Sequence, residues 1–176
     1  MQQVFFMITY ETSVQALDAL KYWYVEVPPH ILEQLPGRKE KGDFNQRLII
    51  TLDDKITWQC GILALGEGAG LITVQQKRLK EVGKTLFDTV KVSLVKDESE
   101  YGVPVSEICR IYWEQVPEAK HAFDELKPGM QRYILNHISQ PKSEEKQLER
   151  TQDMFLRLVR SNPKTVSFRY LLGKED

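Results

Sequence analysis

Cysteine is scarce in this 176-residue chain, which contains only two. Cys60 and Cys109 lie far apart in the sequence, without the paired spacing of a zinc site or of a disulfide framework. Neither has a histidine at a recognisable catalytic spacing. We expect two free thiols, buried or half-buried, in a reducing compartment.

Long apolar runs are absent as well. No segment approaches the about 20 residues that a membrane-spanning helix requires. The N-terminus has no positive region, and Thr9, Tyr10 and Glu11 interrupt the stretch where a secretory signal would have its apolar core. We therefore expect a cytoplasmic protein without a membrane span.

Charge of one sign is not in excess. The 24 basic and 25 acidic residues give a formal net charge of -1, whereas a dedicated non-specific binder of nucleic acid or anionic membrane usually has a strong basic excess. With 41% hydrophobic and 28% charged residues, the composition is that of an ordinary globular protein. A chain of this size buries enough surface to fold without a disulfide, metal or cofactor, and we expect none.

The first hundred residues contain strand signals. His30 to Leu35 fits a short helix, and Arg38 to Gln46 is polar and predicts a loop. Asp53-Asp54-Lys55 joins two β-prone runs, which is typical of a hairpin. The β-prone runs lie at 4–10, 23–27, 48–52, 56–63, 71–74 and 90–95. Strands at this spacing predict a small closed or split barrel.

From Pro104 onward the apolar residues follow a helical period, as at Ala119, Ala122 and Phe123. Prolines punctuate the pattern, and Ser143 is placed as a helix N-cap. The tail at 165–172 is β-prone again. The expected fold is α+β or mainly β: a β-barrel domain at 1–103, then a helical C-terminal subdomain at 104–176 packed on or beside it.

Several motifs resemble those of one family. Gly70-Leu71, Lys77-Arg78-Leu79, Gly83 and Asp88-Thr89-Val90-Lys91-Val92 follow the pattern G-Y-x-I-x-L-x-K-x-L-R-K-x-x-G-x-x-x-G-D-x-V-x-V. This is the N-terminal barrel motif of the YdeI/OmpD-associated, bacteriocin-protection-like family of uncharacterised bacterial proteins. Phe87 stands where that pattern has the glycine before its aspartate.

The helical half resembles the same family, so the resemblance covers 23–159. The matching segments are Pro117-Glu118-Ala119, Phe123, Leu126 to Ile134, and Lys142 to Arg150, which falls where the family has A-K-x-x-x-T-R-x-R-I. Lys146-Gln147 replaces the Thr-Arg pair of that motif. The resemblance implies a barrel similar to the AbrB-like double-split barrel, some of which dimerise and bind DNA. It implies no established catalytic activity, since bacteriocin protection names a phenotype.

Two basic groups are the candidate binding residues. Lys77, Arg78, Lys80 and Lys84 form a local cluster that either contacts phosphates or is a solvated helix face or barrel rim; Arg38-Lys39 and Lys41 form another. Lys142 and Arg150 are predicted to lie on one helical face, two turns apart. They either grip an anion or an acidic partner, or form ion pairs with Glu145, Glu149 or Asp153.

Signs of catalytic chemistry are weak. Gly66-x-Gly68-x-Gly70 precedes a β-prone run rather than a helix, which favours a hairpin turn over a phosphate loop. His30, His121 and His137 are dispersed, without metal-ligand spacing. Asp88 and Asp97 flank a predicted strand, where an aspartate more often caps a turn than acts as an acid or base.

The leading hypothesis is a non-catalytic binding or interaction protein with an unknown protein or small-molecule ligand. A nucleic-acid-binding dimeric barrel is the first alternative, and it would be a homodimer. An enzyme whose site assembles from His121, His137 and Asp88 is the second.

Overall fold

The computed structural model describes residues 7–17, 22–36, 44 and 46–174. The chain divides into two compact units, Met1–Glu98 and Ser99–Asp176, which we call the barrel unit and the helical unit. Each unit has its own cluster of buried hydrophobic residues. The division at 103/104 and the packing of the helices on the barrel stay predictions.

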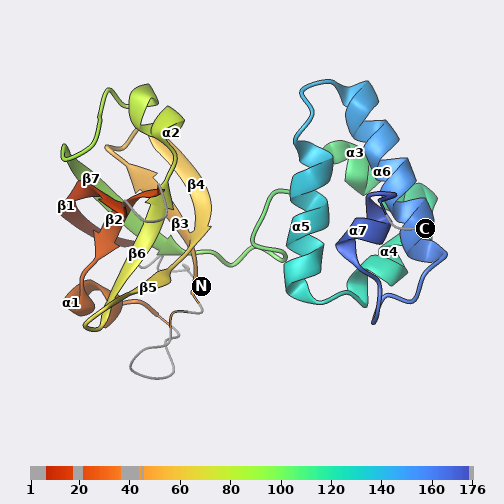
Figure 1. Cartoon of the computed structure of the whole chain (residues 1–176), viewed down its shortest axis with the longest axis horizontal. Helices are drawn as coiled ribbons and strands as arrows, with labels where there is room; N and C mark the ends of the chain where they lie inside the picture. The colour runs from red at the N-terminus through yellow and green to blue at the C-terminus, as the bar shows by residue number, and fades with distance from the viewer. Residues whose placement is uncertain (1–6, 18–21, 37–43, 45, 175–176) are drawn as a thin grey trace, which may run out of the picture. The chain divides into compact units, whose positions relative to one another are not determined.

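The barrel unit is one seven-stranded sheet in the order β4-β3-β7-β1-β2-β6-β5, with every pairing antiparallel. The strands are β1 (Met7–Leu17), β2 (Tyr22–Val27), β3 (Arg47–Leu52), β4 (Ile56–Gly61), β5 (Leu63–Gly66), β6 (Ala69–Val74) and β7 (Thr89–Lys96). The sheet curls into a half-barrel, with α1 (Pro29–Leu32) and α2 (Gln76–Glu81) at opposite ends (Figure 1).

Strand β1 belongs to both halves of the curled sheet. Its first part, to Ser13, pairs with β7, and its last part, from Val14, pairs with β2. From the part of β1 that pairs with β7, the Tyr10 hydroxyl donates a 2.9 Å hydrogen bond to the carbonyl of Glu26 on β2. Burial raises the pKa of Tyr10, so the hydroxyl stays protonated and remains a donor.

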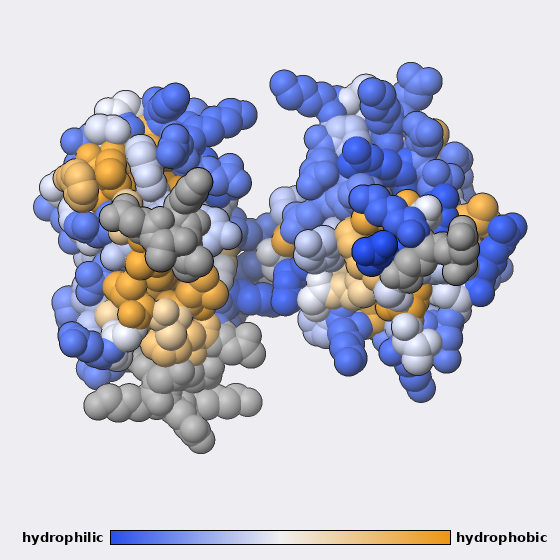
Figure 2. Space-filling view, in the orientation of Figure 1, coloured by the Kyte–Doolittle hydropathy of each residue, from blue (hydrophilic) through white to orange (hydrophobic). Residues whose placement is uncertain are grey.

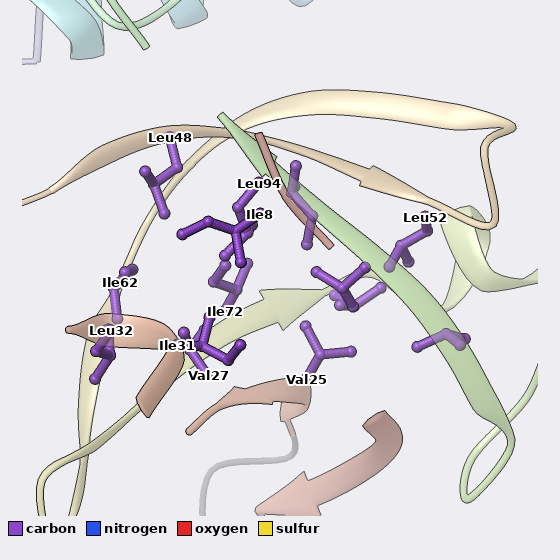
Figure 3. Packing of buried hydrophobic residues seen from close by; sticks show 14 of the residues in the cluster. Ile8, Val25, Val27, Ile31, Leu32, Leu48, Leu52, Ile62, Ile72 and Leu94 are labelled. Atoms are coloured by element: carbon purple, nitrogen blue, oxygen red, sulfur yellow. The ribbon is translucent and has the colours of Figure 1, made fainter. Parts of the chain in front are cut away.

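The core of the barrel unit lies inside the curl. Side chains alternate in and out along each strand, so Leu48, Ile50 and Leu52 of β3 are all fully buried. Figure 3 shows residues of β1, β2, β3, β6 and β7 pointing toward one another with Ile31 and Leu32 of α1. The predicted barrel-type, β-rich N-terminal half is therefore confirmed as a curled antiparallel half-barrel.

Two hairpins have turns whose residues suit a backbone of positive φ. Asp53 and Asp54, between β3 and β4, have φ of 48° and 55°, a left-handed conformation that aspartate tolerates, and the predicted hairpin is confirmed. The glycine-rich stretch joins β5 to β6 as the predicted turn, with Gly66 and Gly68 at positive φ. The predicted strand at 56–63 is wrong in one detail: it breaks at Ile62 into β4 and β5.

Phe87 is strained where the family pattern has glycine, because its φ is 68°. The residue is also 68% exposed. Phe87→Gly should therefore keep or raise the free energy of unfolding, by up to about 1 kcal/mol, although glycine ordinarily lowers it. Phe87→Val should lower it, because a β-branched side chain tolerates this conformation worst. Urea unfolding of both variants measures this, and a loss in Phe87→Gly equal to that in Phe87→Val would contradict it.

The helical unit contains α3 (Glu107–Gln115), α4 (Pro117–Asp124), α5 (Pro128–Ser139), α6 (Glu144–Val159) and α7 (Phe168–Leu171). The predicted N-cap is confirmed, since the Ser143 side chain accepts a hydrogen bond from the Lys146 amide. The β-prone tail is not a strand: it contains α7, which Ser167 caps through the Tyr170 amide.

Aromatic side chains form the centre of the helical unit. Trp113 of α3, Phe123 of α4 and Phe155 of α6 lie with ring centroids 4.9 to 5.9 Å apart in tilted and edge-on geometries. Phe123 and Phe155 are fully buried. This cluster joins the three helices and fixes the surface between α4 and the end of α6.

Candidate functional site

The predicted basic cluster, on α2 and just after it, is divided in its contacts. Lys77 and Lys80 are exposed. The Arg78 guanidinium carbon lies 4.3 Å from the centroid of the Trp58 ring on β4, a cation–π contact. Lys84 donates to the Thr89 carbonyl at 2.8 Å and lies 3.9 Å from an Asp53 carboxylate oxygen. Two of the four cations therefore contact the barrel itself; Arg38, Lys39 and Lys41 lie outside the described residues.

Lys142 and Arg150 do not share a helix. Lys142 is exposed and precedes the N-cap of α6, whereas Arg150 lies within α6. Arg150 Nη1 donates to the carbonyl of His137 at 2.9 Å and to Gln140 Oε1 at 3.4 Å. Arg150 thus caps the C-terminal end of α5, where a cation favours the helix dipole, rather than pairing with the acidic residues of its own helix that the spacing suggested.

Asp88 and Asp97, the two aspartates that flank β7, differ in their contacts. Asp88 accepts a 2.8 Å hydrogen bond from the Thr85 amide, so the predicted turn cap is confirmed. Asp97 is only 2% exposed and accepts from Gln59 Nε2 at 3.2 Å. That contact joins the end of β7 to β4, and the turn cap expected for Asp97 stays a prediction.

Both cysteines are free thiols, as predicted: Cys60 is half-buried and Cys109 is buried. Burial raises the pKa of each thiol to about 12, against a partial lowering by Arg78 at Cys60 and by Arg110 at Cys109. Neither thiol is therefore ionised near neutral pH. Only the ionised thiolate would be nucleophilic.

Within the described part of the chain, no three His, Cys, Asp or Glu residues are grouped to hold a metal ion. His30 belongs to α1 of the barrel unit, and His121 and His137 to α4 and α5 of the helical unit. Over the same residues, no helix has the length and apolar character to cross a membrane.

A groove of about 500 Å³ lies in the helical unit between α4 and the chain just after α6. Its apolar part includes Ala122 and Val159, and its acidic part is Glu118 and Glu125 of α4. His121 Nε2 lies 3.7 Å from Glu125 Oε1. The complete lining is Pro117, Glu118, His121, Ala122, Glu125, Val159, Ser161 and Pro163.

The carboxylates of this groove favour a cation. The negative C-terminal end of α6, at Val159, and the positive N-terminal end of α4, at Pro117, both lie at the groove, so the helix dipoles offset each other there. Ser161 satisfies part of the α6 end, because its amide and its hydroxyl both donate to the Leu158 carbonyl, at 3.1 and 2.9 Å. The groove combines apolar contact with two exposed carboxylates, those of Glu118 and Glu125.

The sequence prediction did not include the groove. The positions of Glu118, His121 and Glu125 place them on one face of a helix, which the helical period could have indicated. No local signal places Val159, Ser161 and Pro163 opposite them, because that contact depends on how α4 packs on α6.

A second pocket, of about 260 Å³, is lined by Tyr133, Asn136, His137, Gln140 and Phe168. The Phe168 ring of α7 meets Tyr133 edge-on at 4.5 Å between centroids and His137 at 5.9 Å. Burial lowers the pKa of His137, and the positive charges of Arg150 and Lys174 lower it further.

This pKa shift predicts a pH dependence. Unfolded histidine titrates near its usual pKa of about 6.5, so the unfolded chain binds more protons just below that pH than the folded one. The free energy of unfolding should therefore fall as pH falls below about 7. In His137→Gln, the fall between about pH 7.5 and 5.5 should be smaller, as measured by urea unfolding. An equal or steeper fall in the variant would contradict this.

The pockets and aromatic centre define a small helical unit with ligand-sized surface recesses. Residues 114–160 of it match the family model described as Bacteriocin-protection, YdeI or OmpD-Associated. The resemblance predicted from the sequence is thus confirmed for this segment, which runs from the end of α3 through α6 and includes most of the lining of both pockets. No curated protein matches the chain.

Proposed function

We propose that the protein is a non-catalytic binding protein. The groove along α4 binds a segment of a partner protein that has an arginine or lysine between apolar residues. The observation that supports this most directly is the placement of Glu118 and Glu125 beside the apolar surface of Ala122 and Val159. The carboxylates pair with the cation, and the apolar side chains contact its neighbours.

The openness of the groove favours a protein segment over a small molecule. The side chain of His121 is 82% exposed and that of Glu125 is 44% exposed. Small-molecule sites usually bury most of their ligand. A chain segment can lie along an open groove and gain affinity from several side chains at once.

Charge reversal tests the proposal. A fluorescein-labelled peptide Ala-Leu-Arg-Leu-Ala should bind the full chain more tightly than its Ala-Leu-Glu-Leu-Ala counterpart, as measured by anisotropy. The double variant Glu118→Lys with Glu125→Lys should weaken binding of the arginine peptide at least about tenfold, because like charges then face each other.

The matched control is Glu114→Lys with Glu149→Lys. Both residues are exposed in the helical unit and outside the groove, and the net charge changes equally. This control should bind the arginine peptide within about twofold of the parent chain, because neither carboxylate lines the groove and the charges of exposed side chains are screened by salt. Equal affinity for the two peptides, or equal losses in both double variants, would overturn the proposal.

We further propose that the barrel unit is a double-split barrel of the AbrB type and that the protein is cytoplasmic. The sharing of β1 between two halves of the sheet supports the first point. Nucleic-acid binding by a barrel dimer is the weaker alternative, since Arg78 and Lys84 contact Trp58, Thr89 and Asp53 of the barrel itself.

A further inference from the structure

The pocket between α5 and α7 has a chemistry opposite to that of the acidic groove. Its walls are aromatic rings from two helices, Tyr133 and His137 on α5 and Phe168 on α7. Figure 2 shows hydrophobic surface over the middle of the helical unit, where α7 lies in Figure 1, with hydrophilic side chains around it. This pocket is independent of the groove along α4.

The aromatic walls suit a flat ring. Phe168 meets both Tyr133 and His137 edge-on, at interplanar angles of 68° and 87°. An aromatic ligand can continue this arrangement with edge-to-face or offset contacts, which aromatic pairs prefer. The volume of about 260 Å³ is below the range of roughly 300–1,000 Å³ for drug-sized ligands, which favours a single-ring molecule.

The amide of Gln140 is oriented by a neighbour. Its Oε1 accepts a hydrogen bond from Arg150 Nη1, so the oxygen side of the amide is occupied by the guanidinium. The Nε2 hydrogens are then the groups that Gln140 can donate to a ligand. Asn136 contributes a second amide to the same lining. The polar part of the pocket therefore offers hydrogen-bond donors.

The charges that act on the pocket are positive. Arg150 and Lys174 both act on His137, whose pKa they lower along with burial, so the imidazole is mostly neutral near pH 7. Arg150 also caps the α5 carbonyl end through the His137 carbonyl, which offsets the negative end of that helix dipole. Donors in a positive field favour an anionic ligand.

We propose that the pocket between α5 and α7 is a binding site for a small planar aromatic carboxylate. The ring lies against Tyr133, His137 and Phe168, and the carboxylate accepts hydrogen bonds from the amides of Asn136 and Gln140. Arg150 and Lys174 supply the favourable potential without direct contact. The site lies apart from the groove lining, so its ligand and the basic segment bind separately.

Benzoate is the probe, with benzyl alcohol and benzylamine as neutral and cationic controls of the same ring. In a ¹⁵N–¹H correlation titration of the full chain, benzoate should shift the amides of the pocket lining saturably, with a dissociation constant near the millimolar range expected for so small a ligand. Benzyl alcohol should bind at least about fivefold more weakly, and benzylamine more weakly still.

Gln140→Glu is the decisive variant. It keeps an oxygen acceptor for Arg150, so the cap of α5 is retained, but it replaces the donor with a negative charge. Benzoate affinity should fall at least about tenfold, while Gln152→Glu, an exposed change of equal charge on α6, should leave it within about twofold. Tyr133→Ala, at a side chain 63% exposed, should weaken benzoate with little effect on folding.

Three results would each overturn the proposal. The first is an absence of saturable benzoate shifts in the lining of the pocket. The second is equal affinity for benzoate and benzyl alcohol, which would leave an apolar recess without anion recognition. The third is equal benzoate affinity in Gln140→Glu and Gln152→Glu, with both variants folded by their amide spectra.

Discussion

Replacing Phe155 with alanine should lower the free energy of unfolding of the helical unit by about 3–5 kcal/mol. Phe155 is fully buried, and its ring contacts Trp113 of α3 and Phe123 of α4, with centroid distances of 5.9 Å to each. It also stacks on Tyr112 at 5.6 Å. Truncation removes these contacts and leaves a cavity between three helices. Amide hydrogen exchange of α4, α5 and α6 measures the loss within this unit.

The matched control is the next residue of the same helix. Leu156 is 48% exposed, so Leu156→Ala changes a side chain at the surface of α6 and should cost less than about 1 kcal/mol. Equal losses at the two positions would mean that the aromatic centre does not stabilise the unit. Because Phe155 packs α4 against α6, Phe155→Ala should also disturb the shape of the groove beside Val159.

The second large effect is expected in the barrel unit. Leu94 is fully buried on β7, where it pairs with Ile8 of β1 and Ile50 of β3, both also buried. Leu94→Ala should lower the free energy of unfolding of the barrel unit by about 2–5 kcal/mol, through the cavity it leaves among three strands. Hydrogen exchange of β1, β3 and β7 amides measures this.

Met7 supplies the control for Leu94. It lies on β1 opposite Val95, and it is 63% exposed. Met7→Ala should change the protection of the same strands by less than about 1 kcal/mol. Equal effects of Met7→Ala and Leu94→Ala would mean that the inside of the curl is not the core, contrary to the alternating burial of β3.

Features set by neighbouring residues were predictable from the sequence. The Asp53-Asp54 turn depends on a left-handed backbone that aspartate tolerates, and the Ser143 cap depends on a side chain that accepts from an amide three residues on; both are confirmed. The β-prone runs predicted at 48–52 and 90–95 likewise form β3 and β7, and the side chains of β3 alternate between a buried and an outer face. The segment at 165–172 was misassigned because its β-branched and aromatic residues outweighed a local signal, the capping serine at Ser167.

Contacts between distant segments were not predictable in the same way. Arg150 has acidic residues at helical spacing along its own helix, yet it donates to His137 and Gln140 of α5. Which helix presents those acceptors depends on packing rather than on spacing. The groove and the smaller pocket were missed for the same reason, since Val159 and Phe168 lie far in sequence from the helices they face.

The most direct test of the proposed binding function is to locate the arginine peptide on the full chain by ¹⁵N–¹H chemical-shift mapping. The groove along α4 predicts saturable shifts at Ala122, Val159 and Ser161, and none at the amides of the basic cluster from Lys77 to Lys84. Shifts confined to that cluster, or a peptide with glutamate in place of arginine shifting the same groove amides at the same concentration, would contradict it.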